Sequence, residues 1–191
     1  MKDPYKKFKL WFAQVKKKEK QDPTAFALGT SDLNNQPHVR MVLLKKIAKD
    51  GFIFFTNLNS NKGKQFNNNK KVSMCFYWET INRQIRIVGV GEEISDKESD
   101  LYFSSRARGS QIGAWASKQS RNLGNRKEFL ERVKHYEKKF SDKIVKRPKY
   151  WRGIKIIPIE FEFWKQGNFR MHEREVYLLD KKKWKSKILY P

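Results

Sequence analysis

The stretch KVSMCFYWETINRQIRIVGVGEEI, residues 71–94, predicts two β-strands, 71–78 and 83–94, joined by the short segment ETIN. On its N-terminal side, three more strands are predicted around polar turns, in AFALGTSD, NNQPHVRMVLLKKI and GFIFFTN. On its C-terminal side, closing strands are predicted in IKIIPIEFEFW, REVYLLD and KWKSKILY. Many short strands with few helices predict a mainly β (α+β) fold, a β-barrel or closed sheet with helices packed outside.

Helices are predicted from apolar spacing and from capping residues. Residues 4–21 carry apolar side chains at the spacing of an amphipathic helix, and another such helix lies within 121–140. Ser60 is a candidate N-cap, and Ser95 with Glu98 forms a capping-box pattern for a helix to about residue 105. Since there is no repeat and no linker rich in Gly and Ser, a single domain over residues 1–191 is expected.

Charge and cysteine content limit the class of protein. The formal net charge is +23, but the Lys clusters at 16–20, 138–140 and 181–187 are scattered. This scatter favours a solvated basic surface over a nucleic-acid site. The single cysteine, Cys75, excludes a disulfide framework within one chain and fits a reducing compartment. With no apolar run of ~18 residues and no signal-peptide pattern, a cytoplasmic protein without a membrane segment is expected.

The familiar catalytic and nucleotide motifs do not occur. There is no P-loop and no G-x-S-x-G, and VGVGEEI has only two of the glycines of a dinucleotide fingerprint, so a strand bulge or close packing explains it better. His38, His135 and His172 lack metal-ligand spacing, and no metal is expected. An enzyme with this sequence would take its chemistry from an organic cofactor.

Two segments could bind a phosphate in the N-terminal half. In HVRMVLLKK, Arg40 and Lys45 are isolated cations in an otherwise apolar strand and point to opposite faces. Alternatively, they only mark the ends of the strand, with their charges in solvent. In FFTNLNSNKGKQ, Lys62 and Lys64 fall in the first turn of the predicted helix, where the helix dipole disfavours cations. A bound phosphate would relieve that conflict, although an exposed turn is equally compatible.

A third segment, LYFSSRARGSQIGAWASKQS, combines a phenol, a guanidinium and a hydroxyl. Tyr102 and Arg106 are four residues apart on the predicted helix, and Ser110 follows just after its end. Together they suit a phosphomonoester, unless Tyr102 packs in the core and Arg106 is merely solvated. The remainder, QIGAWASKQS, shows no clear period.

The fourth segment is QGNFRMHEREVYLL, residues 166–179. As a strand it would place Arg170, His172 and Arg174 on one face, with Trp164 just upstream. Such a face could line a pocket for a flat conjugated ring, because arginine stacks on rings and imidazole exchanges protons near neutral pH. The alternative is a solvent-facing edge strand that carries Arg for solubility.

These segments occur in the same order in a known family. The chain resembles bacterial pyridoxamine (pyridoxine) 5′-phosphate oxidases over nearly its whole length. The most specific motifs are SQIGAW-x-S-x-QS and R-x-H-x-R, supported by DPTAFALGT, RMVLLK, FFTNLNSNK, NNNKKVSMCFYW, RQIRIVG and the ending LYP.

The resemblance implies an FMN-binding split β-barrel that forms a homodimer with FMN at the interface, the part from about residue 150 completing the barrel and the interface. It implies FMN contacts from Arg40, Met41, Val42, Leu43, Lys45, Phe55, Thr56, Asn61, Lys62, Gln84, Gln119, Ser120, Trp164 and Arg174. Substrate contacts are implied for Lys45, Tyr102, Arg106, Ser110, Arg170 and His172, of which Arg170 and His172 would be catalytic.

The implied reaction is oxidation of pyridoxamine or pyridoxine 5′-phosphate by dioxygen to pyridoxal 5′-phosphate and hydrogen peroxide. Two departures from the family pattern are Phe55, where Tyr is frequent, and Asn61, where Arg is frequent. The alternatives are another split-barrel FMN oxidoreductase, such as a flavin reductase, and a non-enzymatic module that binds FMN or nucleic acid. A nucleic-acid module would predict aromatics interleaved with Lys on one surface, whereas here they mostly lie in strand interiors.

Overall fold

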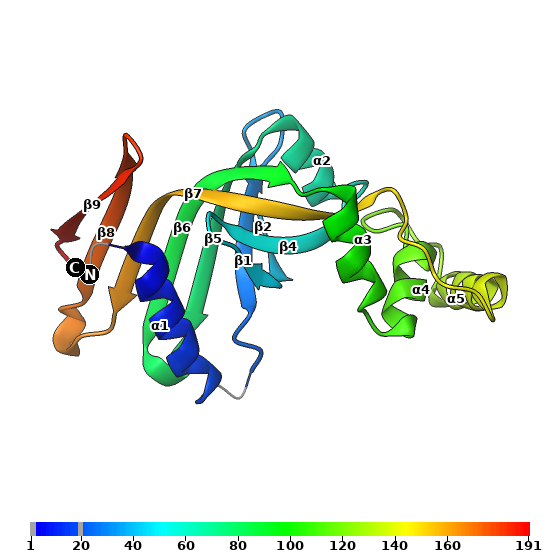
Figure 1. Ribbon diagram of the computed structural model, residues 1–191, viewed down its shortest axis with the longest axis horizontal. Coiled ribbons are helices and arrows are strands. Elements are labelled where there is room, and N and C mark those ends of the chain that lie inside the picture. Colours follow the sequence, from blue (N-terminus) through cyan, green and yellow to red (C-terminus); the bar gives the residue numbers. More distant parts are fainter. Residues whose placement is uncertain (1–2, 19–20) are drawn as a thin grey trace.

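The computed structural model describes residues 3–18 and 21–191, and within these ranges a curled antiparallel sheet forms a half-barrel with five α-helices around it (Figure 1). The strands are β1 (Ala25–Ser31), β2 (Pro37–Leu43), β3 (Lys46–Ile47), β4 (Phe52–Asn57), β5 (Lys71–Trp78), β6 (Arg83–Glu93), β7 (Trp151–Lys165), β8 (Glu173–Asp180) and β9 (Lys183–Leu189). The helices are α1 (Pro4–Lys16), α2 (Asn61–Asn68), α3 (Asp96–Ser104), α4 (Arg108–Ala116) and α5 (Arg126–Phe140). The predicted mainly β fold with helices outside the sheet is confirmed.

Strand β7 organises the sheet. The order is β2-β1-β5-β6-β7-β4-β3, and β7 also pairs with β8, which in turn pairs with β9. The first half of β7 pairs with β4 and its second half with β8, while β6 runs along both halves. The register of β6 against β7 shifts between Val88 and Gly89, where a Cβ would lie 2.4 Å from the Ile157 carbonyl oxygen. The glycines of VGVGEEI therefore mark a bulge and close packing, as predicted.

The main core lies between α1 and the concave face of the sheet. Phe8 and Val15 of α1 are fully buried, and the Phe8 ring lies 4.7 Å from Phe52 and 5.3 Å from Phe76. Asp3 caps α1 by accepting a hydrogen bond from the Tyr5 amide. The helix ends at Lys16, earlier than the predicted residue 21, and residues 19–20 of that prediction lie outside the described residues.

A second, smaller core lies under α3, α4 and α5, which extend beyond the end of β4 and β7 (Figure 1). Phe103, Ile112, Val145 and Trp151 form its buried centre. The predicted N-caps are confirmed: Ser60 accepts from the Gly63 amide, and Ser95 accepts from the Glu98 amide. In the described part of the chain, no helix has the length and apolar character needed to cross a membrane.

Two further features of the fold differ from the sequence predictions. The strand predicted within 34–47 is divided into β2 and β3. The Leu44 amide still bonds to the Thr24 carbonyl oxygen, in register with β1, whereas the Lys45 amide bonds to the Ile53 carbonyl oxygen of β4. The segment QIGAWASKQS contributes most of α4, which the sequence did not predict. Its small residues obscure the apolar period, and Ile112 and Ala116 become buried only against the second core.

Candidate active site

A cleft of about 470 Å³ opens between the β2–β4 side of the sheet and helices α3 and α4. This volume lies within the usual range for small-molecule sites. It is lined by eleven of the predicted site residues, Met41, Val42, Leu43, Lys45, Phe55, Thr56, Lys62, Tyr102, Arg106, Ser110 and Gln119. The phosphate-binding segments predicted from sequence thus come together in one place.

Lys62 supplies a cation at one end of this cleft. It lies in the first turn of α2, and its Nζ donates to Thr56 Oγ1 at 3.1 Å and to Gln119 Oε1 at 3.0 Å. Burial, together with the charge of Arg40, lowers the pKa of Lys62 to about 8. These partners are neutral, so the charge of Lys62 remains uncompensated and is available to an anion at the N-terminus of α2.

Arg40 lies beside the cleft but does not line it. Its guanidinium donates to the Thr30 hydroxyl, the Leu28 carbonyl oxygen and Gln65 Oε1, which tie β2 to β1 and α2. Asn61 is exposed at the start of α2, and Ser120 adjoins Gln119 with a positive φ of 68°, but neither lines the cleft. Their implied FMN contacts stay predictions.

Arg106 supplies the second cation. Its guanidinium carbon lies 4.7 Å above the Trp151 ring, and its Nη1 is buried without a hydrogen-bond partner among the described residues. Burial lowers the pKa of Arg106, while neighbouring Tyr102 opposes that shift. The Tyr102 ring stacks on Phe55 with centroids 3.9 Å apart. An unpaired buried donor on a cationic group suits an anionic ligand in the cleft.

The secondary structure that brings Tyr102, Arg106 and Ser110 together differs from the prediction. Helix α3 ends at Ser104, so Arg106 lies in the turn before α4 and not one helical turn from Tyr102. Ser110 lies within α4 and not after a helix end. The turn is held by Gln111, whose side-chain amide donates to the Phe103 and Ser104 carbonyl oxygens and so caps α3.

Sequence reasoning missed several residues of this cleft. Asn57, Gly113, Ala114, Ser117 and Trp151 also line it. Asn57 ends the strand FIFFTN, so the polar end of that segment was an available signal. No local signal pointed to Trp151, which reaches the cleft only because β7 begins beside β4.

A second group of predicted residues lies across β6, β7 and β8. Gln84 pairs with Trp164, and Trp164 pairs with Arg174, so the three form one row across the sheet. The His172 ring lies 4.6 Å from the Trp164 ring. Arg174 is bonded to Glu162 at 2.8 Å, which raises its pKa further.

Residues 166–179 do not form one strand, which was the condition for a shared face of Arg170, His172 and Arg174; the predicted strand REVYLLD is confirmed as β8. Asn168–Arg170 form a 3₁₀ turn in which Phe169 and Arg170 have positive φ, and β8 begins only at Glu173. The turn is tight at Gly167, where a Cβ would lie 1.9 Å from the Met171 carbonyl oxygen. Arg170 and His172 therefore do not share a strand face with Arg174.

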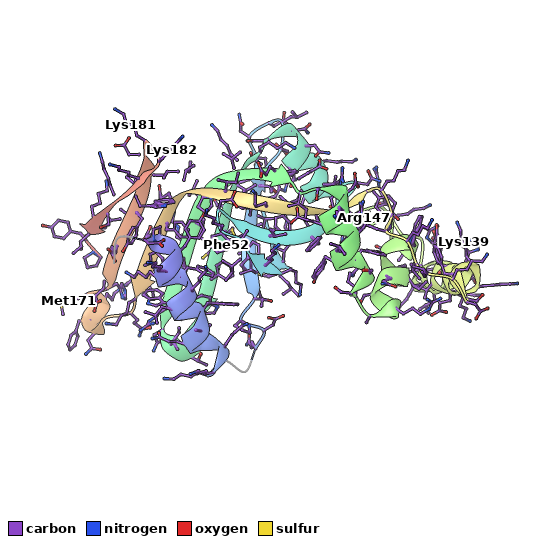
Figure 2. The ribbon with its side chains drawn as sticks, viewed as in Figure 1. Phe52, Lys139, Arg147, Met171, Lys181 and Lys182 are labelled. Carbon is purple, nitrogen blue, oxygen red and sulfur yellow. The ribbon has the colours of Figure 1, made fainter. Side chains whose placement is uncertain are left out.

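The two groups are far apart within one chain. Figure 2 shows Met171, between Arg170 and His172 in sequence, at one end of the molecule and Arg147 by α3 toward the other. None of Gln84, Trp164, Arg170, His172 and Arg174 lines the cleft that contains Tyr102 and Arg106. Among the described residues, no group of three or more His, Cys, Asp or Glu side chains could hold a metal ion.

Comparison with known proteins identifies the family. The family described as pyridoxamine 5′-phosphate oxidase matches residues 13–140, and the pyridoxine 5′-phosphate oxidase C-terminal dimerisation region matches residues 151–191. The chain belongs to the pyridoxamine 5′-phosphate oxidase family. The predicted family is thus confirmed.

The relatives of this oxidase family cover the whole chain. The pyridoxine/pyridoxamine 5′-phosphate oxidase of Pelagibacter ubique is 50% identical, over 99% of this chain and 92% of its own. The protein of the same name from Zymomonas mobilis is 48% identical, over 99% and 98%.

Solved structures confirm the split-barrel architecture. PhzG from Burkholderia lata, in complex with tetrahydrophenazine-1-carboxylic acid, matches with a TM-score of 0.93 and 27% identity, over 100% of this chain and 94% of its own. A pyridoxamine 5′-phosphate oxidase-related, FMN-binding protein from Nostoc punctiforme matches in fold, with a TM-score of 0.80 at 13% identity, over 99% and 98%.

Proposed function

We propose that this protein is an FMN-dependent oxidase of vitamin B6 metabolism that converts pyridoxamine 5′-phosphate and pyridoxine 5′-phosphate to pyridoxal 5′-phosphate, with dioxygen as oxidant and hydrogen peroxide as product. The observation that carries the proposal is that the cleft is lined at separate positions by Lys62 and Arg106, neither of which has a carboxylate partner among the described residues. Two cationic positions suit two phosphate groups, one on the cofactor and one on the substrate.

Lys62 marks the end of the cleft that would hold the FMN phosphate. The charged Nζ already lies within hydrogen-bond distance of the Thr56 hydroxyl and of Gln119 Oε1. The first-turn amides of α2 add donors and a favourable dipole. An anion here would replace the neutral acceptors of Lys62 with a charge, so these residues fit FMN.

Arg106 marks the end that would hold the substrate phosphate. Tyr102, Ser110 and Lys45 line the cleft with it and add two hydroxyls and an ammonium group. Each hydrogen bond to a charged group contributes ~1.5–3 kcal/mol, so three such donors are enough for micromolar binding of a phosphomonoester. The stack of Tyr102 on Phe55 keeps the phenol ring in place.

A homodimer would bring the second residue group to this cleft. In the proposed dimer, Gln84, Trp164 and Arg174 of the partner subunit contact the flavin, and Arg170 and His172 of the partner subunit lie over the substrate ring. The match of residues 151–191 to a dimerisation region supports this arrangement. So does the exposed apolar face of β2, where Val39 is 70% and Met41 64% exposed.

The side chains would divide the work of positioning. FMN, when bound, would supply the two-electron redox chemistry between the substrate and dioxygen. Arg170 would favour the anionic form of the substrate ring system, and His172, whose Nδ1 accepts from the Gly167 amide at 3.3 Å, would orient the ring or tune its protonation. By holding the substrate phosphate, Arg106 and the phosphate-binding residues beside it, Lys45, Tyr102 and Ser110 (the phosphate clamp), would keep the reacting carbon in place.

The two departures from the family pattern affect the cofactor end. Phe55 retains the ring stack on Tyr102 but has no hydroxyl to offer. Asn61 is exposed at the start of α2 and provides no cation beside Lys62. Lys62 would then carry more of the FMN phosphate interaction than it would beside an arginine.

Turnover by the purified protein tests this proposal. The protein should be yellow, release FMN on denaturation, and form pyridoxal phosphate and hydrogen peroxide only when oxygen is present. Arg170→Ala should lower turnover sharply, whereas Arg126→Ala, at an exposed arginine of α5, should leave it unchanged. Colourless protein that does not take up added FMN would refute the proposal.

The same assay separates the alternative flavin chemistries. The PhzG ligand carries a carboxylate and no phosphate, so substrates with and without a phosphate should be compared. Equal turnover of pyridoxine and its phosphate would remove the role assigned to Arg106 and favour another split-barrel oxidoreductase.

A further inference from the structure

Glu162 is a buried carboxylate held between two arginines. It lies on β7 and is 5% exposed. Its Oε1 accepts from Arg174 Nε at 2.8 Å and lies 2.8 Å from Nη2 of the same guanidinium, while Oε2 accepts from Arg86 Nη1 at 3.1 Å. A carboxylate out of water is costly unless both oxygens are paired, and here both are.

The exposure of the three side chains is unequal. Arg86 is 51% exposed and Arg174 28%, against 6% for the Glu162 side chain. The two arginines therefore cover the carboxylate and still present part of their own surface to the outside. If the carboxylate were lost, water could hydrate both guanidinium groups, so neither arginine requires Glu162 to compensate for its burial.

The strand register explains why Glu162 reaches Arg174. Glu162 and Trp164 are two residues apart on β7 and share a face, and Arg174 of β8 pairs with Trp164. Arg174 is therefore the diagonal neighbour of Glu162, within reach of long side chains. The ion pair holds the Arg174 side chain against the sheet face that also carries Gln84.

Glu162 determines how the Arg174 guanidinium is turned. Nε and Nη2 face the carboxylate, and Nη1 donates to the Tyr190 carbonyl oxygen at 3.2 Å. A partly exposed arginine side chain otherwise samples several orientations. Glu162 also reduces the summed charge of the two arginines from two units to one.

We propose that Glu162 is a positioning residue for the flavin: it holds the Arg174 guanidinium in the orientation that contacts FMN, and its negative charge moderates the positive potential there. The inference rests on the proposed function, in which Arg174 contacts the flavin. Glu162 itself touches neither FMN nor substrate in this scheme.

The first test is FMN affinity, measured by quenching of FMN fluorescence as apoprotein is added. In Glu162→Gln the amide offers one acceptor oxygen and turns a donor toward the other arginine, so it cannot serve both. The dissociation constant should rise about tenfold, the equivalent of one weakened hydrogen bond to a charged group. In an Arg174→Ala background the same substitution should have less than about a twofold effect, because Glu162 acts through Arg174.

The matched control is Glu160→Gln. Glu160 lies two residues earlier on β7, and no ion pair joins it to another described residue. It undergoes the same change of charge and shape. Its FMN affinity should equal that of the unmodified protein.

The second test is the midpoint potential of bound FMN. Removing the negative charge of Glu162 should shift this potential to more positive values, because the arginines then favour the more negatively charged, reduced flavin. A merely structural role for Glu162 would change stability and leave the potential where it is.

Three results would overturn the inference: FMN affinity in Glu162→Gln equal to that of Glu160→Gln, an equal loss of affinity with and without Arg174, or an unchanged potential. If the unmodified protein itself fails to bind FMN, the proposed function is overturned, and the inference with it. Normal FMN binding by the unmodified protein with no effect of Glu162→Gln would overturn the inference alone.

Discussion

The affinity of this protein for FMN should depend on pH through Lys62. Its Nζ is bonded to the neutral side chains of Thr56 and Gln119, and no carboxylate pairs with it among the described residues. Burial and the charge of Arg40 lower the pKa of Lys62 to about 8, whereas an ordinary lysine titrates above ~10. The Lys62 ammonium therefore loses its proton within a pH range in which binding can be measured.

The size of the effect follows from this pKa of about 8. The ammonium form makes up about nine-tenths of Lys62 at pH 7 and about one-tenth at pH 9. The charged form is lost as the pH rises, and the phosphate dianion prefers the charged form. The dissociation constant for FMN should therefore increase about tenfold between pH 7 and pH 9.

The assay is fluorescence titration of FMN with apoprotein at pH 7, 8 and 9 and fixed ionic strength. Lys62→Arg retains a charge throughout this range, because a guanidinium titrates above ~12, so its affinity should not follow the pH. Lys64→Arg, at the exposed lysine two residues later, should behave like the unmodified protein. The reasoning is refuted if Lys62→Arg and the unmodified protein show the same pH dependence.

Three further predictions concern the clamp, the core and the turn. Arg106→Lys should raise KM for the phosphorylated substrates about ten- to a hundredfold, because a lysine ammonium cannot replace the several donors of the guanidinium, whose Nη1 is available to the phosphate. An unchanged KM in steady-state kinetics would contradict this. Phe8→Ala should lower the free energy of unfolding by ~3–5 kcal/mol in urea titrations, since Phe8 is fully buried, whereas Leu10→Ala, at a half-exposed position, should cost less than ~1 kcal/mol. Gly167→Ala should lower turnover up to ~100-fold by displacing the turn before His172, while Gly109→Ala, where a Cβ meets nothing within 4 Å, should raise stability slightly; equal turnover in both variants would argue against a role for the turn.

The parts of the fold that were predictable from sequence are those with a strong local pattern. The strands 71–78 and 83–94 were confirmed as β5 and β6 with the end of β6 one residue earlier. Ser60 and Ser95 begin helices as predicted, because capping depends on a few neighbouring residues. In α4, by contrast, small residues conceal the helical period, and only packing on the second core defines the helix.

The candidate site was predictable in composition but less so in geometry. Lys62, Tyr102 and Arg106 were expected to bind phosphate, and they line one cleft. Arg170 and His172 were expected to share a strand face with Arg174, but a turn with positive φ at Phe169 and Arg170 separates them. The alternation of side chains between two faces holds only for an extended backbone. The polar turn residues beside Gly167 allowed the backbone to form a turn there instead.

Sequence alone determined most of the strands and helices, though not α4, and the chemical groups that the chain offers to a ligand, because period, capping and residue type are local properties. Only the tertiary structure decided that β7 pairs with three strands and carries Trp151 to the cleft at one end and Trp164 to the row with Gln84 and Arg174 at the other. It also decided that Glu162 is buried against Arg174 and that Lys62 has a lowered pKa. Pairing, burial and electrostatic neighbours depend on contacts between residues far apart in sequence, and no local pattern encodes them.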